Sequence, residues 1–169
     1  MKQIKLRPEP YEVLFRIQRG LAGYISYLAA CDVNTAFSEY VLYEPILHIL
    51  MSRGYAVRCE FPCPGIPKPV RGDRKKVDFE ATKPDQRFAL EVKWARERQL
   101  NIANDRKKLL AFHEADSTSR SFLCIFGRMS DINKDIPMKS EFTEKGSPVF
   151  ADFHRTKYGC RIYELNVAS

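Results

Sequence analysis

Apolar and polar residues alternate on both sides of a polar turn between Lys75 and Lys93, which predicts a β-hairpin. Pro84 and Asp85 supply the turn chemistry. Without a bulge, the hairpin pairs residues whose numbers add up to 169, so Asp78 is expected opposite Glu91. The apolar positions of the two strands are Val77, Phe79, Ala81, Phe88, Leu90 and Val92.

The polar residues of this hairpin are unusual for a buried strand. Residues two apart share a face, so Glu91 and Lys93 are expected to point together, with Val92 in the opposite layer. Directly opposed carboxylates, with Cβ atoms roughly 4.5–5.5 Å apart, repel each other. Such a pair either raises the pKa of one acid or binds a metal ion. The alternative is an exposed face on which both acids are solvated beside Lys93, but the apolar run 88–94 favours a central strand.

Helical spacing of apolar residues precedes the hairpin twice. Between residues 10 and 30 the pattern is interrupted by Gly20 and Gly23, which predicts one broken helix or two short ones. Its aromatic residues are expected to pack on the core, and a partner surface is the alternative. A second helix is predicted over 36–53, capped by Asn34 or Thr35 and ending at Gly54.

The second helix carries two candidate acids. Glu39 lies at the open end of its apolar stripe, whereas Glu44 falls toward the polar side. Pro45 is expected to cost a hydrogen bond and to kink the helix near Val41. The apolar stripe itself consists of Leu42, Ile46, Ile49 and Leu50.

The remaining segments complete an α/β pattern. Strands are predicted at 55–61, with Tyr55, Val57, Cys59 and Phe61 on one face, at 121–126 and at 159–167. A helix is predicted at 101–115, a proline-rich loop at 62–72, a polar loop or lid at 130–147 and an exposed turn at 152–157. The order helix, strand, strand, strand, helix, strand, strand predicts a central mixed β-sheet flanked by helices.

Composition adds a compartment and a class of partner. The net charge of +7 favours anionic partners, with nucleic acid first. Five scattered cysteines suit a reduced, cytoplasmic compartment, and no second pair completes a zinc site with Cys59 and Cys63. Neither a signal peptide nor a membrane-spanning segment is indicated. The basic residues nearest the hairpin, which either contact phosphate or form a solvated edge, are Arg71, Arg74, Lys75 and Lys76.

These residues resemble the PD-(D/E)xK, or restriction-endonuclease-like, nuclease superfamily over about 38–127. Asp78 and Glu91-Val92-Lys93 occupy the places of the family's acid and ExK triplet, although Val77 replaces the usual proline. The segment 39–46 with 54–60 looks like the opening of uncharacterised members of this superfamily, in which Glu39 rather than Glu44 is the active-site acid. Asp105 and Lys107 also look like a recurring feature of the helix after the ExK strand.

The resemblance implies a restriction-endonuclease-like core (αβββαβ) at about 36–127, within one domain 1–169. An N-terminal helical extension (1–34) and a C-terminal loop and strand (128–169) flank this core. It also implies a Mg²⁺- or Mn²⁺-dependent nuclease that hydrolyses phosphodiester bonds, in DNA rather than RNA and with low sequence specificity. The implied metal ligands are Asp78, Glu91, the Val92 carbonyl and, through water, Glu39, all hard oxygen donors.

Lys93 would orient or help to deprotonate the attacking water, beside the catalytic acids Asp78, Glu91 and Glu39. Besides the basic run before Asp78, Arg106 and Lys107 are the expected nucleic-acid contacts. A catalytically inactive nucleic-acid-binding or protein-interaction module on the same fold is the alternative function. A homodimer through the N-terminal aromatic helices would allow both strands of a duplex to be cut.

Overall fold

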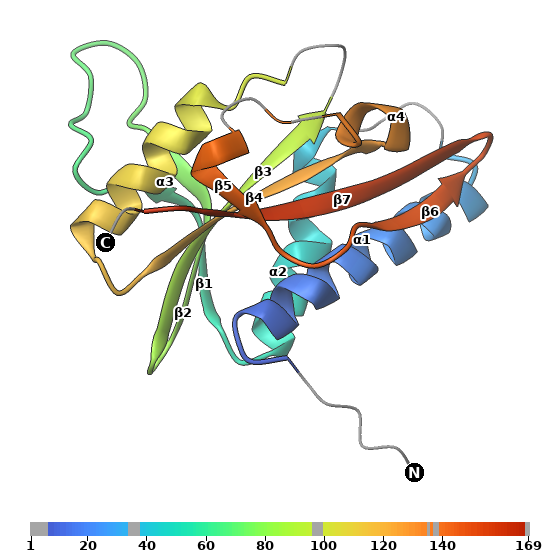
Figure 1. Cartoon of the computed structure of the whole chain (residues 1–169), viewed down its shortest axis with the longest axis horizontal. Helices are drawn as coiled ribbons and strands as arrows, with labels where there is room; N and C mark the ends of the chain where they lie inside the picture. Colours follow the sequence, from blue (N-terminus) through green and yellow to red (C-terminus); the bar gives the residue numbers. More distant parts are fainter. Residues whose placement is uncertain (1–6, 34–37, 96–99, 135, 137–138, 168–169) are drawn as a thin grey trace.

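A curled mixed sheet with helices on both faces forms the centre of the computed structural model (Figure 1). The structure describes residues 7–33, 38–95, 100–134, 136 and 139–167. Within these ranges, the strands are β1 (Ala56–Pro62), β2 (Lys76–Lys83), β3 (Gln86–Ala95), β4 (Arg120–Arg128), β5 (Phe142–Glu144), β6 (Val149–Phe153) and β7 (Thr156–Leu165). The helices are α1 (Tyr11–Ala30), α2 (Tyr43–Ser52), α3 (Ala103–Ala115) and α4 (Met129–Ile132), with 3₁₀ turns η1 (Glu39–Leu42) and η2 (Lys139–Glu141).

The strand order is β1-β2-β3-β4-β7-β5, and β6 pairs with β7. The neighbours β1, β2 and β3 are antiparallel, and β3 pairs with β4 in parallel across the α3 crossover. An antiparallel hairpin followed by a helical crossover is what the sequence predicted, so the mixed α/β architecture is confirmed. Strand β4 is buried on both faces, as its near-continuous apolar run predicted.

The two faces of the sheet carry separate hydrophobic clusters. Phe88, Leu90 and Val92 of β3 pack with α1 and α2. Ala89, between them in the sequence, packs with Leu109 of α3. The alternation of β3 therefore directs Val92 away from α3, as predicted, and leaves Glu91 and Lys93 on the face that α3 covers.

Helix α1 is continuous, so the expected break at Gly20 and Gly23 is wrong. Gly20 lies where α1 meets α2, and a Cβ there would lie 2.4 Å from Ile49 Cδ1. The glycine thus serves close helix packing rather than helix termination. Of the aromatic residues of α1, Tyr11 and Tyr24 pack against the core, as expected, whereas Tyr27 is exposed.

The second helical segment begins as a 3₁₀ turn, η1, and becomes α-helical at Tyr43. Pro45 is the third residue of α2, where a backbone N–H would have no helical partner, so its expected cost does not arise. Gly54 follows α2 with φ of 79°, the left-handed geometry that was predicted. The candidate caps Asn34 and Thr35 lie outside the described residues.

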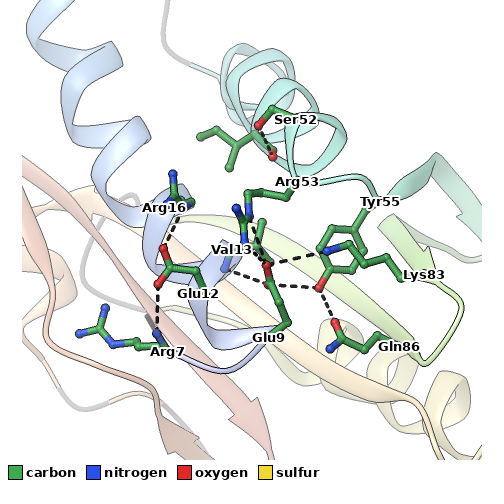
Figure 2. Close-up of polar contacts among 11 residues, drawn as sticks. Arg7, Glu9, Glu12, Val13, Arg16, Ser52, Arg53, Tyr55, Lys83 and Gln86 are labelled. Atoms are coloured by element: carbon green, nitrogen blue, oxygen red, sulfur yellow. Dashed lines mark hydrogen bonds and ion pairs between the residues drawn. The ribbon is translucent and has the colours of Figure 1, made fainter. Parts of the chain in front are cut away.

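A cluster of polar side chains around Glu9 anchors the start of α1 to the rest of the fold (Figure 2). Glu9 accepts a hydrogen bond of 2.7 Å from Arg53 Nη2 and one of 3.3 Å from the Tyr55 hydroxyl. Its ion pair with Lys83 spans 3.8 Å, and Tyr55 also donates to Gln86 at 2.6 Å. The cluster holds the turn of the β2–β3 hairpin against α2, and thereby the end of the hairpin remote from Asp78.

Strand β1 does not keep one face throughout, contrary to the prediction. Tyr55 and Val57 pack with the α1–α2 cluster, whereas Phe61 packs with the α3 cluster. Glu60 between them has φ of 51°, which turns the strand over. Its partner strand behaves in the same way, since Val77 and Phe79 lie in different clusters. This change of face occurs beside Asp78.

The C-terminal third contains more regular structure than its polar sequence predicted. The expected loop at 130–147 includes the end of α4, η2 and β5, and the expected exposed turn at 152–157 is a hairpin between β6 and β7. Strand β7 spans 156–165 rather than 159–167. The short strands β5 and β6 pair with opposite halves of β7. The backbone pairing with β7 allows them to form although their own sequences have only a weak apolar pattern.

The approach of β6 to β7 provides a stability test. A Cβ at Gly159 would lie 2.3 Å from the Val149 carbonyl oxygen, so Gly159→Ala is expected to lower the free energy of unfolding by about 1–3 kcal/mol. In α1, a Cβ at Gly23 would meet nothing within 4 Å, so Gly23→Ala is expected to stabilise by roughly 0.5–1 kcal/mol. Urea unfolding of both variants measures the difference, and equal effects would contradict the packing at Gly159.

Candidate active site

The pairing of β2 with β3 stops where the change of face occurs. The register, Lys83 opposite Gln86 and Phe79 opposite Leu90, is the predicted one. Beyond it, the Asp78 side chain replaces the backbone partner, because Val92 N–H donates a hydrogen bond of 2.7 Å to Asp78 Oδ2. Asp78 therefore fills the space that opens between the two strands.

Glu39 reaches the same edge of β3 from the start of η1. Trp94 N–H donates a hydrogen bond of 2.8 Å to Glu39 Oε1. In a strand, the N–H and C=O of one residue point to the same side, so the Val92 carbonyl faces this edge as well. Glu44, by contrast, is exposed on α2. Of the two candidate acids, Glu39 is the one that contacts the hairpin.

Glu91 is buried beneath α3, with 1% of its surface exposed. Lys108 Nζ lies 2.5 Å from Glu91 Oε2 and 3.4 Å from Asp105 Oδ1. Lys93 Nζ forms an ion pair of 3.3 Å with Asp105 Oδ2. Among the described residues, Glu91 Oε1 has no hydrogen-bond partner. Helix α3 thus supplies a cation and an anion that meet the two charged residues of β3.

Asp78 and Glu91 are close in register but do not form the predicted pair on one face. Asp78 accepts a hydrogen bond from the Tyr43 hydroxyl at the start of α2, whereas Glu91 meets Lys108 on the α3 side. The physical reason is the change of face in β2, which turns Asp78 away from the α3 layer. The shared face of Glu91 and Lys93 agrees with their common contact to α3.

Burial dominates the electrostatics of both acids. It raises the pKa of Glu91 well above its ordinary value, the charges of Asp78 and Asp105 add to this, and Lys108 opposes it. Burial also raises the pKa of Asp78, against the hydrogen bonds from Tyr43 and Val92. Burial and then Asp78 raise the pKa of Tyr43, so its hydroxyl remains a donor at neutral pH. At both carboxylates burial therefore outweighs the opposing effect of the Lys108 ammonium group.

The donor set fits a cation that needs few protein ligands. Across the described part of the chain, no three His, Cys, Asp or Glu side chains converge as a metal-binding group. Asp78, Glu91 with its unpartnered Oε1, and the Val92 carbonyl remain as oxygen donors. Mg²⁺ commonly binds through one or two carboxylates and keeps several waters, so this set suits Mg²⁺ better than a metal that requires a full protein cage.

The expected nucleic-acid contacts lie in different settings. Arg71, Arg74 and Lys75 are exposed in the β1–β2 loop, and Lys107 is exposed on α3. Lys76 opens β2 and lies 3.7 Å from Glu60. Arg106 forms an ion pair with Glu141 of η2. The loop and Lys107 thus present the cations most accessible to an external anion.

Sequence reasoning missed Lys108 and Tyr43. Lys108 follows Asp105 by three residues, so both lie on one face of α3, and this spacing was the available signal. Tyr43 follows Glu39 by four residues, one turn further along the same segment. Neither spacing indicates which strand the helix will cover, and contact with Glu91 or Asp78 depends on that.

Comparisons with family models, with curated proteins and with solved structures gave no match to this chain. Within the described ranges, no helix is both long enough and apolar enough to cross a membrane. The case for a function therefore depends on the geometry around β3. That geometry consists of Asp78 and Glu39 at the edge of β3, and of Glu91, Lys93 and Lys108 on the face that α3 covers.

The raised pKa of Asp78 has a measurable effect on stability. Between the ordinary and the raised pKa, the folded chain binds more protons than the unfolded chain, so stability falls as pH rises through this window. Asp78→Asn removes the charge and is expected to raise Tm at neutral pH without divalent cations by roughly 2–4 °C. The gain should disappear once the pH falls below the ordinary range of aspartate, where both side chains are neutral.

Thermal unfolding of the two proteins between pH 3 and pH 8 checks this expectation. Asp85→Asn, at an exposed turn position of the same hairpin, is the matched control and should leave Tm unchanged. A lower Tm for Asp78→Asn at neutral pH would show that the ionised carboxylate stabilises the fold.

Proposed function

We propose that this chain is a metal-dependent nuclease of the PD-(D/E)xK type that hydrolyses phosphodiester bonds, in DNA rather than RNA and with low sequence specificity. The observation that carries the proposal is that Asp78 and Glu39 accept hydrogen bonds from the backbone N–H groups of Val92 and Trp94, the residues that follow Glu91 and Lys93 in β3. The succession α2, β1, β2, β3, α3, β4 also agrees with a restriction-endonuclease-like core.

Asp78, Glu91 and the Val92 carbonyl would hold Mg²⁺ or Mn²⁺, with Glu39 contributing through water. Such a cation would stabilise the negative charge that develops on the phosphate oxygens during hydrolysis. The carboxylates are suited to this role because burial and mutual repulsion disfavour their charged forms when no cation is present.

Lys93 is the residue we assign to the attacking water and the phosphate. Its side chain is about one-third exposed, and Asp105 holds its ammonium group on the α3 face of β3. An ammonium in this position donates hydrogen bonds to a water or to a phosphate oxygen. Lys108 has a different role, because its ammonium is mostly buried and neutralises Glu91 and Asp105 within the fold.

Nucleic acid is the substrate class that the charge favours. The chain has a net charge of +7, and exposed cations lie on the β1–β2 loop and on α3. Lys108 of α3 contacts both the base of this loop and Glu91. Helix α3, which carries the exposed Lys107, is a sheet crossover and not the second helix of a helix-turn-helix pair. Recognition through the phosphate backbone, with low sequence specificity, follows.

The second candidate is a nucleic-acid-binding or protein-interaction module without catalysis. One observation favours it: Lys108 already forms an ion pair with Glu91, so the buried carboxylate is partly neutralised without a metal ion. In that case the lysine would be a permanent structural partner. Binding of DNA without cleavage under every divalent cation would distinguish this function from the nuclease.

Three substitutions test the catalytic assignment. Asp78→Ala, Glu91→Ala and Lys93→Ala are each expected to abolish Mg²⁺-dependent cleavage while DNA binding in EDTA is retained. Incubation with plasmid and with single-stranded DNA, in Mg²⁺, Mn²⁺ or EDTA, measures cleavage. Lys157→Ala, on the exposed β6–β7 hairpin, is the control and should cut like the wild type. Unchanged rates in all three variants would exclude this site.

The two helix acids provide a matched pair. Glu39→Gln keeps an oxygen that can accept the Trp94 N–H but removes the charge, and should lower the cleavage rate by at least about tenfold. Glu44→Gln changes an exposed residue on the neighbouring turn and should have no effect. The reverse result would assign the acid to Glu44. Initial rates at saturating Mg²⁺ provide the measurement.

A further inference from the structure

The loop between β1 and β2, residues 63–75, projects from the sheet beside α3 (Figure 1). Its base is closed by a hydrogen bond of 2.8 Å from Cys63 N–H to the Lys75 carbonyl. Cys63 is fully buried, and its thiol donates to the carbonyl of Lys108 at 3.2 Å. The first residue of the loop is therefore bonded to Lys108, the residue whose ammonium group contacts Glu91.

Prolines restrict the shape of this loop. Pro64, Pro67 and Pro69 fix φ at three positions, and residues 66–69 have no helix, strand or turn. Gly65 and Gly72, on either side of the tip, adopt φ of 74° and 92°. The tip is thus a proline-restricted segment between two glycines in the left-handed region. A chain restricted in this way loses little conformational entropy when it binds.

The exposed surface of the loop is basic. The loop contains four exposed basic residues and one exposed acid, Asp73. The basic residues are Lys68, Arg71, Arg74 and Lys75. Elsewhere in the described ranges most basic side chains have an acidic neighbour, such as Lys76, whose Nζ lies 3.7 Å from a Glu60 carboxylate oxygen. Within the described residues, none of the four loop cations has an ion-pair partner. Their charge is available to an external polyanion.

Val70 at the tip is completely exposed, at 103% of its reference area. A single exposed valine is ordinary. Here, however, it follows a proline-restricted segment and is followed at once by Arg71. The result is an apolar tip flanked by cations, which is the combination that proteins insert between base pairs from the minor groove.

We propose that the β1–β2 loop enters the minor groove of duplex DNA, with Val70 as a wedge against the base pairs and Arg71 and Arg74 along the groove walls. The inference rests on the proposed function in taking DNA as the ligand, and it specifies duplex as the form that is bound. The minor groove is about 6 Å wide and admits an extended chain, whereas the major groove suits a helix or a β-ribbon.

Insertion of the loop would deform the duplex. A wedge partly unstacks the base step that it contacts, and this costs least at flexible steps such as TA. The base of the loop is bonded to the carbonyl of Lys108, whose ammonium group meets Glu91, so the loop starts beside the candidate active site. Duplex DNA should therefore bind more tightly than single-stranded DNA of the same length, and TA-containing duplexes more tightly than G·C-rich ones.

The test measures binding in EDTA, where no cleavage occurs, with a short duplex that carries 2-aminopurine at a central TA step. Wild-type protein should raise the 2-aminopurine fluorescence. Netropsin, which occupies the minor groove, should displace the protein from the same duplex with adenine in place of 2-aminopurine. Val70→Ser should lose the fluorescence rise and weaken binding by about tenfold, with an unchanged salt dependence. Arg71→Gln should instead reduce the slope of log K against log salt by about 1.

Val167→Ser, at another exposed valine, is the matched control and should behave as the wild type. A wild-type fluorescence rise in Val70→Ser, or failure of netropsin to compete, would overturn the inference, as would equal or tighter binding to single-stranded DNA or RNA. Equal melting temperatures of the variants would show that the folds are intact.

Cleavage in Mg²⁺ is scored separately. If the protein deforms the duplex but never cuts it, the inference about the loop stands and the proposed nuclease activity is wrong. If the protein cuts DNA and Val70 contributes nothing to binding or deformation, the nuclease activity stands and the inference about the loop is wrong.

Discussion

The carboxylate of Glu91 is buried between β3 and α3, and this single charge constrains much of the surrounding structure. A buried carboxylate requires a positive partner, and Lys108 provides one from α3. Lys108 can do so only because α3 crosses over the sheet at this strand, with Leu109 and Phe112 packed on the same face. The neutralisation of Glu91 therefore depends on the position of α3 over β3.

The general architecture could be predicted because it depends on patterns that are local in sequence. The hairpin register followed from a two-residue turn, and the buried β4 followed from a continuous apolar run. The errors share a different cause. Gly20 resembles a helix breaker until Ile49 is placed against it, and the turnover at Glu60 depends on a backbone angle that no alternation of residue types indicates.

The residues of the candidate site could be predicted in part, but their contacts could not. Spacing alone brought Asp78 near Glu91, and the resemblance selected Glu39, which lies against β3 in the structure. Spacing could not indicate that Asp78 turns toward Tyr43 while Glu91 turns toward Lys108, because that difference arises from the change of face in β2. It also could not distinguish Lys107 from Lys108, adjacent residues of which one is exposed and the other meets Glu91.

The hydrogen bonds from Val92 and Trp94 to Asp78 and Glu39 have a further consequence for how the site works. Each carboxylate is held by a backbone N–H of the same rigid strand, so its orientation is set by folding and not by a ligand. A site preorganised in this way needs little rearrangement when charge arrives, and the associated reorganisation energy is small. The geometry of the acids should therefore be the same before, during and after each encounter with a ligand.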